Sequence, residues 1–341
     1  MTPAPRQDGE IPTQPRQPLD PLEVMVRDIW QGVLGGSIGS VTERFSALGG
    51  TPEQAARMLA EVERACGRPA PPAAHSADVT IAALAELMKA PESAAGRARK
   101  YIGRNLNAGP DQRPELFLMH GDMNGGGFYC LALAGHLGKD QPVHAFAPLG
   151  VDGRALPPTI EDMVAEPLAE LRRLRPRGPY RLAGYCNGGL VAYEMARALV
   201  AEGEVVERLI LIAPNLPGAR LPEAGWTVER IRNGIQRRVR GLLRRGPAPP
   251  EAAPSAEMPL SLFERYRRIM RGYRPGRFTG PLAIFWPAEE PYAMREGASR
   301  AWLEAAPQAV IRQVPGAHLT AITTHVAALG GAVRACLDGK V

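Results

Sequence analysis

A single cysteine lies at the centre of a glycine-flanked turn. Residues 181–199 read RLAGYCNGGLVAYEMARAL, which predicts the end of a strand, a tight turn and the start of a helix. Gly184 and Gly188 flank Cys186 at a distance of two residues, and a turn that strains its central residue needs small neighbours at these places. A helix beginning near Asn187 directs its positive dipole end at the turn, which favours a thiolate and an oxyanion. Cys186 is therefore the candidate nucleophile, and a buried, inert thiol is the alternative.

A glycine-rich loop provides the second half of a candidate oxyanion hole. Such a hole needs two backbone N–H donors, one from the residue after the nucleophile and one from a loop that follows an early strand. Asn187 supplies the first donor. The stretch LFLMHGDMNGGGFY at 116–129 supplies the second, with Asp122 as the expected donor and Met123 as the alternative. We interpret His120 in this loop as a structural residue in preference to a base.

The general base is expected after the last strand. The sequence VPGAHLTAITTHV places His318 in a turn directly after a strand pattern, whereas His325 falls in a helical pattern, so His318 is the candidate. A third, orienting residue is harder to find. FWPAEEP offers Glu290, which has the better spacing, and Glu289, while Asn215 is an amide alternative. A thiol ionises more easily than a hydroxyl, so a weak orienting residue is tolerable beside cysteine.

The elements that must position these residues alternate between strands and helices. Helical patterns such as 160–173 and 189–202 separate short apolar runs, and this alternation predicts a mostly parallel sheet with helices on both faces. The expected strands are 116–120, 142–148, 180–184, 207–214, 282–287 and 309–316. An arginine-rich block interrupts the alternation between the fourth and fifth strands. An insertion at the carboxyl side of the sheet is a lid candidate, which we place at about 217–278.

The N-terminal third has a different pattern. Apolar residues at helical spacing predict helices at 22–36, 52–66 and 80–88, which together make a small bundle. The proline-rich residues 1–20 read as a disordered leader, and the polar residues 91–110 read as a linker. The expected organisation is thus a leader, a helical bundle over 21–90, a linker and an α/β domain over 111–341.

Composition excludes several classes of protein. The 341 residues are 45% hydrophobic, with no run as long as a membrane span. The net charge is +6, but residues 218–280 carry fourteen arginines and five glutamates, so the rest is slightly acidic. This segment is either a solvated surface or a site for an acidic or phosphate-bearing partner, and its few aromatics argue against nucleic acid. Scattered cysteines without a C-x-x-C pair indicate free thiols in a reducing cytoplasm, with no zinc site: Cys66, Cys130, Cys186 and Cys336.

Three stretches resemble a known family. The glycine-rich loop with its following strand, the cysteine turn with its helix, and VPGAHLTAITTHV are similar to the thioesterase domains that end nonribosomal peptide and polyketide synthases. The resemblance covers 111–341. It implies an α/β-hydrolase fold with a helical lid, acting on acyl thioesters presented on the phosphopantetheine of a carrier protein. Family members usually have serine in the turn, a minority cysteine, and usually an aspartate where this chain has Ala213.

The N-terminal bundle resembles a carrier protein of the same systems. The resemblance covers 21–90 and places LGGTPEQ where carriers read L-G-G-D-S-L. The serine that would receive phosphopantetheine is replaced by Pro52, which has no hydroxyl. We therefore expect a degenerate carrier without a permanently bound cofactor, and an acyl group that arrives on another carrier's arm or on coenzyme A.

Taken together, these residues predict a thioesterase-fold enzyme of natural-product biosynthesis. The expected reaction moves an acyl group onto Cys186 and then to an amine, to an intramolecular nucleophile or to water. A cysteine thioester favours transfer over hydrolysis, because amines attack thioesters more readily than water does. An editing hydrolase that clears misloaded carriers is the enzymatic alternative. A non-catalytic scaffold is the alternative of another class, since Ala213 and Pro52 both depart from the family pattern.

Overall fold

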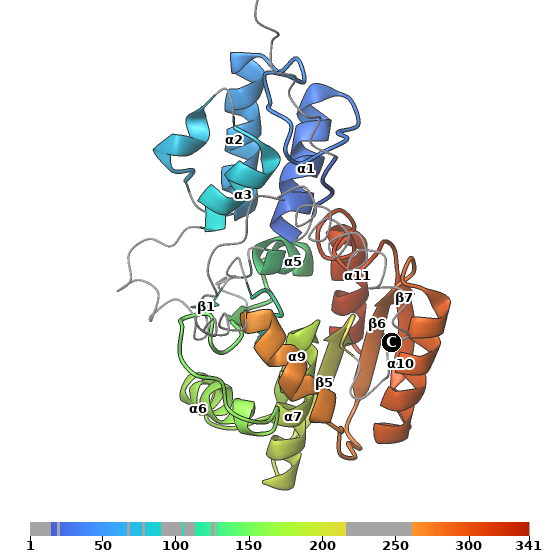
Figure 1. Ribbon diagram of the computed structural model, residues 1–341. Helices are drawn as coiled ribbons and strands as arrows, with labels where there is room; N and C mark the ends of the chain where they lie inside the picture. The colour runs from blue at the N-terminus through green and yellow to red at the C-terminus, as the bar shows by residue number, and fades with distance from the viewer. Residues whose placement is uncertain are drawn as a thin grey trace, which may run out of the picture.

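A seven-stranded sheet forms the centre of the protein, in the order β1-β3-β2-β4-β5-β6-β7 (Figure 1). The computed structural model describes residues 15–18, 21–66, 69–76, 79–89, 104–105, 113–123, 127, 129–215 and 261–340. The strands are β1 (Arg104–Asn105), β2 (Leu116–Met119), β3 (Val143–Phe146), β4 (Tyr180–Tyr185), β5 (Val206–Ile212), β6 (Leu282–Pro287) and β7 (Val310–Val314). The six strands expected from the sequence are confirmed as β2 to β7, and these pair in parallel.

The edge strand β1 was not expected. Arg104 and Asn105 pair antiparallel with Ala145 and His144 of β3, inside the stretch that the sequence predicted as linker. A strand of two residues leaves no periodicity in a polar sequence, so only the pairing partner reveals it. The other residues of 91–110 lie outside the described residues, as do most of the expected leader and residues 217–260 of the expected lid.

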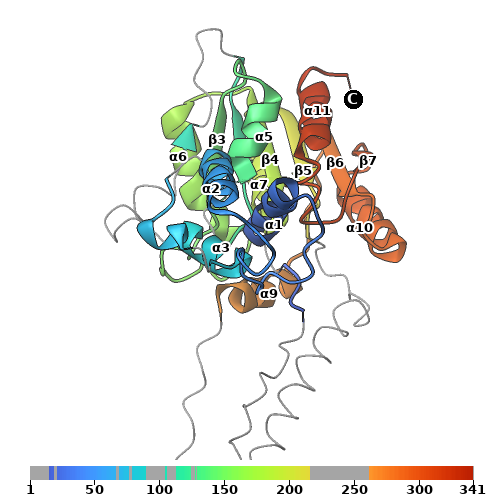
Figure 2. The same cartoon turned by 90° about the horizontal axis from the view of Figure 1, so that it is seen from above.

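Alternate strand residues face two separate cores. On β2, Leu116 and Leu118 belong to one cluster of buried side chains, and Phe117 and Met119 belong to the other. Helices α5 (Tyr129–Leu137) and α11 (Val326–Leu337) pack in the first cluster. The second contains η2 (Asp162–Val164), α6 (Ala165–Leu174), α7 (Asn187–Ala201), α9 (Leu262–Gly272) and α10 (Tyr292–Ala305). Both faces of the sheet are therefore covered by helices (Figures 1 and 2).

The N-terminal helices form a small bundle beside this domain. They are α1 (Pro21–Leu34), α2 (Pro52–Cys66), η1 (Pro72–His75) and α3 (Ile81–Lys89), which confirms the three predicted helices. Trp30 packs edge-on against Phe45 in the bundle core, with ring centroids 4.8 Å apart. Helix α2 contacts α5, and the bundle's buried side chains belong to the same cluster as α5 and α11 (Figure 1). Among the described helices, none has the length and apolar character needed to cross a bilayer.

Candidate active site

The cysteine turn has the strained geometry that its sequence predicts. Cys186 follows β4, precedes α7 and has φ 56° and ψ −122°, in the region that non-glycine residues rarely adopt. A side chain at Gly184 would place its Cβ 2.5 Å from the carbonyl oxygen of Gly188, and a Cβ at Gly188 would overlap the carbonyl of Met119. Only glycine therefore fits on either side of the cysteine, and the turn is held tightly between β4, α7 and β2.

Backbone hydrogen bonds fix the nucleophile position. The N–H of Cys186 donates to the carbonyl of Ile212 at 3.0 Å, and the carbonyl of Cys186 accepts from the N–H of Gly189 at 3.1 Å. The same carbonyl accepts from the N–H of Asn215 at 3.3 Å. These bonds tie the turn to the end of β5 and to the first turn of α7, so its strained conformation is supported from both sides.

The glycine-rich loop lies directly against the turn. A Cβ at Gly121 would come within 2.8 Å of the Cβ of Cys186 and 3.0 Å of the backbone nitrogen of Asn187. The N–H of Asp122 donates to Nδ1 of His120 at 3.3 Å. Within the described residues, the N–H of Met123 has no hydrogen-bond acceptor. Of the two sequence candidates for the second oxyanion donor, Met123 is thus the one whose N–H has no competing partner here.

His120 has the surroundings of a structural residue. Its side chain is buried, and a Cβ at Gly127 would collide with its ring, 2.6 Å from Nε2. Gly127 has φ 69°, and its N–H donates to the Asp122 carboxylate at 3.1 Å. Burial lowers the pKa of His120 to about 4, so the ring is neutral at pH 7. It orders the loop through its contact with Asp122.

His318 and Glu290 meet at the ends of β7 and β6. Nδ1 of His318 lies 3.6 Å from Oε1 of Glu290, and burial raises the pKa of this carboxyl. The hydroxyl of Tyr185 donates to the carbonyl of His318 at 2.8 Å, and their rings lie 5.2 Å apart. Tyr185 precedes the nucleophile, so one residue of the cysteine turn anchors the histidine loop. Its place inside the G-Y-C-N-G motif was the only sequence signal for this role.

The two alternative orienting residues lie elsewhere. Glu289 is exposed, and its backbone N–H donates to the carbonyl of Gly316 at 3.0 Å. The amide of Asn215 donates to Oδ1 of Asn187 and lies 3.6 Å from the sulfur of Met270 on α9. Its side chain is therefore engaged with Asn187, the first candidate oxyanion donor. Ala213, the family's usual acid position, is buried and has φ 42°.

Burial sets the protonation states of the reacting groups. It raises the pKa of Cys186 to about 12, although the Asn187 N–H acts in the opposite direction, and the Glu290 and Asp122 carboxylates raise it further. Burial lowers the pKa of His318 to about 4, below its ordinary 6.5, while 34% of its side chain stays exposed and admits solvent. The two pKa values shift in opposite directions, but both shifts favour the neutral form. At pH 7 Cys186 is therefore a neutral thiol and His318 a neutral imidazole.

The position at which a carrier would hold its arm lies at the start of α2. Pro52 is the first residue of α2 and is exposed. Thr51 caps this helix, because its hydroxyl accepts from the N–H of Gln54 at 3.2 Å and its own N–H donates to the Gln54 side chain at 3.0 Å. The threonine hydroxyl beside the proline is thus already used in a capping box.

All candidate catalytic groups lie at the carboxyl edge of the parallel sheet. The glycine-rich loop follows β2, Cys186 follows β4, Glu290 follows β6 and His318 follows β7. Loops that follow neighbouring parallel strands converge at one edge, and this is where open α/β sheets bind ligands. The site is therefore assembled from four loops that the sheet order brings together.

Comparisons with known proteins agree with this architecture. Residues 114–335 match the family model described as "Thioesterase domain". A dimodular nonribosomal peptide synthase of Bacillus subtilis (strain 168) is 30% identical over 199 residues, which are 58% of this chain and 8% of that protein. This chain thus spans less than a tenth of that relative's length.

Two solved structures share the fold. The NocB thioesterase domain from the nocardicin cluster has a TM-score of 0.50 and 23% identity, covering 70% of this chain and 99% of that one. A four-domain nonribosomal peptide synthetase bound to AMP and glycine has a TM-score of 0.51 and 21% identity, covering 96% of this chain and 27% of that one. Because the match to the four-domain synthetase covers 96% of this chain, it includes the N-terminal helices. The expected α/β-hydrolase fold with helices before it is confirmed.

Proposed function

Since the chain belongs to the thioesterase domain family of peptide and polyketide synthases, we propose that it is an acyl-transferring enzyme whose nucleophile is Cys186. The acyl group arrives as a thioester on the phosphopantetheine arm of a carrier protein or on coenzyme A. It leaves on an amine, an intramolecular nucleophile or water. The observation that carries the proposal is the strained, glycine-flanked position of Cys186, against Gly121 of the glycine-rich loop. The His318–Glu290 pair at the ends of β7 and β6 supports it.

The first step exchanges one thioester for another. Neutral His318 takes the thiol proton as the sulfur of Cys186 attacks the acyl carbon, and Glu290 stabilises the imidazolium that forms. The oxyanion accepts hydrogen bonds from the N–H of Asn187 and from that of Met123 or Asp122. The bond between the acyl carbon and the sulfur of the carrier arm or coenzyme A then breaks, and His318 gives the proton to that departing sulfur. The products are the free carrier thiol and an acyl thioester on Cys186.

The second step releases the acyl group. Transfer of the acyl group from one thiol to another changes the free energy little, so the acyl-cysteine keeps most of the driving force for the next step. Transfer to a serine would release more of that free energy on forming the ester. An amine that attacks the acyl-cysteine gives its proton to His318, and the cysteine sulfur leaves and is reprotonated. Because amines attack thioesters more readily than water does, transfer is favoured over hydrolysis. The same residues would serve hydrolysis if water were the only nucleophile admitted.

Product analysis distinguishes transfer from editing. The protein is incubated with an acyl thioester of N-acetylcysteamine, with and without a series of primary amines, and products are separated and identified by mass. We expect amide to form at the expense of free acid as amine concentration rises, and neither product with Cys186→Ala. Release of free acid at a rate that no amine changes would contradict transfer and favour an editing hydrolase. A non-catalytic scaffold would release nothing.

A further inference from the structure

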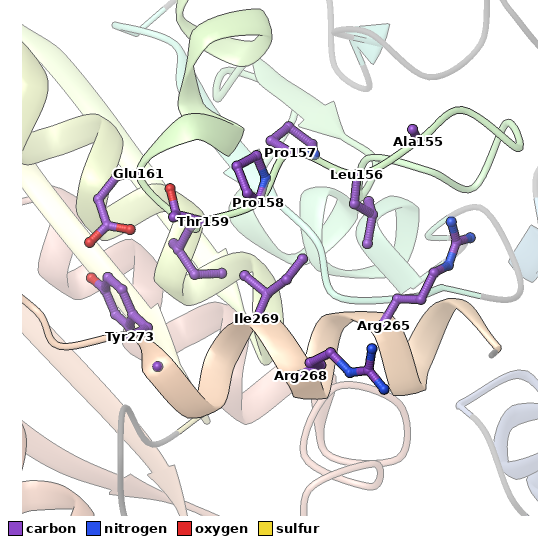
Figure 3. Close-up of a pocket in the computed structure, with 12 residues that line it drawn as sticks. Ala155, Leu156, Pro157, Pro158, Thr159, Glu161, Arg265, Arg268, Ile269 and Tyr273 are labelled. Carbon is purple, nitrogen blue, oxygen red and sulfur yellow. The ribbon is translucent and has the colours of Figure 1, made fainter.

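A cavity lies between α9 and the loop that follows β3. Its volume is about 790 Å³, and it is bounded on one side by residues 155–161 and on the other by one face of α9 (Figure 3). Arg265, Arg268, Ile269 and Gly272 line it, at the spacing of three and four residues that places side chains on the same helix face. This helix lies in the described part of the arginine-rich segment, and two of that segment's arginines line the cavity, half-buried Arg265 and exposed Arg268.

The cavity walls combine positive charge with apolar surface. Leu156, Pro157 and Pro158 form the loop wall, and Arg265 and Arg268 extend from the opposite helix at one end of the cavity (Figure 3). Glu161 and Tyr273 lie together at the other end. A ligand that fits this arrangement carries an anionic group at the arginine end and an extended, partly apolar chain along the prolines.

The two arginines have no ionic partner among the described residues. Nε of Arg265 is buried without a hydrogen-bond acceptor. Three other arginines of the domain are paired, since Arg154, Arg197 and Arg334 each contact a carboxylate at 2.5–3.0 Å. A buried guanidinium N–H without an acceptor is costly, and an anionic ligand would supply the missing acceptor to Nε of Arg265.

The same helix connects the cavity to the nucleophile. Met270 follows the cavity residue Ile269, and its sulfur lies 3.6 Å from the amide of Asn215. Asn215 in turn donates to the side chain of Asn187, the residue after Cys186. The hydroxyl of Tyr266 donates to the carbonyl of Leu149 at 3.0 Å, which fixes α9 to the loop that forms the other wall. One side of α9 therefore lines the cavity while Met270 reaches the turn.

We infer that this cavity binds a phosphate or carboxylate on the substrate that acylates Cys186, with Arg265 and Arg268 as its ligands. The inference rests on the proposed function. Two parts of such a substrate can carry the anion: the phosphate of a phosphopantetheine arm, or an acidic group on the acyl chain. Guanidinium groups bind both by charge-assisted, bidentate hydrogen bonds.

Binding to an acyl-transfer-deficient protein tests the inference without requiring turnover. Cys186→Ala is titrated calorimetrically with phosphopantetheine, with pantetheine and, for the second source, with an acyl-pantetheine that ends in a carboxylate or in its methyl ester. We expect the anionic member of at least one pair to bind about tenfold more tightly. The combined Arg265→Gln and Arg268→Gln substitutions should abolish that difference. Arg271→Gln is the matched control, since Arg271 lies on the same helix but does not line the cavity.

The outcomes separate this inference from the proposed function. A preference for phosphopantetheine identifies the arm as the source, and a preference for the acidic acyl chain identifies the acyl group. Equal affinities within both pairs, or a preference that survives the double substitution, would overturn the inference. If the preference is found but wild-type protein forms no acyl-cysteine, the proposed function fails and the binding site stands. If acylation occurs without any preference, the binding site fails alone.

Discussion

A cysteine thiol and a serine hydroxyl in the same turn differ in when they lose the proton. A serine must be deprotonated as it attacks, whereas cysteine is often found as a preformed thiolate beside a protonated histidine. Here burial opposes the charged forms of both partners, since it raises the pKa of Cys186 and lowers that of His318. Both groups are then neutral at rest, and in the proposed mechanism His318 acts as a general base in the way it would for serine.

The pH dependence of alkylation separates a neutral pair from an ion pair. Because the Cys186 pKa is raised to about 12, its reaction with iodoacetamide should keep accelerating above pH 9, with no plateau near neutrality. Acylation needs neutral His318, and a lowered pKa keeps it neutral to lower pH, so the acid limb should lie below pH 6.5. Alkylation is followed by mass spectrometry, with Cys186→Ala as the blank for the other cysteines. A plateau in the alkylation rate between pH 5 and 8 would indicate a thiolate–imidazolium pair instead.

Glu290 is expected to assist His318 without being essential. Glu290→Gln keeps the size of the side chain but removes the charge that favours imidazolium. We expect kcat/KM to fall about 10- to 100-fold, less than the ~10⁴-fold loss known when a serine triad loses its carboxylate. The His318 pKa should fall further, which moves the acid limb of the pH profile down. Glu289→Gln, at the exposed neighbouring position, should change kcat/KM less than twofold. If Glu289→Gln lowers kcat/KM as much as Glu290→Gln does, the assignment of Glu290 as the orienting residue is wrong.

At the scale of elements, the cysteine turn was predictable from sequence because its constraints are local. Two glycines at fixed spacing, a preceding apolar run and a following helical pattern are all visible in 181–199, and the structure has β4, the turn and α7 there. The orienting residue was less predictable, since Glu290 and His318 meet only when β6 and β7 pair. Asn215 was a reasonable candidate by type, but the side chain turns toward Asn187 and Met270. Side-chain direction in a loop leaves no sequence pattern.

The glycines of the turn provide a test at this scale. A Cβ at Gly188 would overlap the carbonyl of Met119, so Gly188→Ala should cost about 1–3 kcal/mol of unfolding free energy and reduce acylation. Gly331→Ala is the matched control, because nothing lies within 4 Å of the added methyl group inside α11. Alanine there should stabilise the helix by up to about 1 kcal/mol. Urea titration measures both, and equal effects of the two substitutions would contradict the tight turn.

At the scale of the whole molecule, the N-terminal bundle and the α/β domain share one buried cluster. The sequence predicted the bundle's helices and its resemblance to a carrier, but a contact between α2 and α5 joins residues too far apart for any local pattern to show it. The hydroxyl of Thr324 also donates to the carboxylate of Asp28 across this boundary. A bundle fixed in this way, with Thr51 used as a helix cap, suits a structural role better than delivery of an arm.

Destabilising the bundle should therefore destabilise the catalytic domain. Met58 is fully buried in the bundle core, and Met58→Ala should cost about 2–5 kcal/mol. If the bundle and the domain unfold together, the temperature at which activity is lost falls with the temperature at which helical circular dichroism is lost. Arg64→Lys, at an exposed position of the same helix, should change neither. A separate early transition that leaves activity unchanged would show that the bundle unfolds independently.

The acyl group on Cys186 is the central intermediate, and its detection tests the proposed function most directly. Intact protein is mixed with an acyl thioester for seconds, quenched in acid and weighed by mass spectrometry, and the modified residue is located in peptides. We expect one acyl group per chain, on Cys186, in wild-type protein and a slower, stoichiometric adduct in Glu290→Gln. Cys186→Ala should acquire no mass. An adduct on another residue, or none on protein that remains folded and retains its thiol, would contradict Cys186 as the nucleophile.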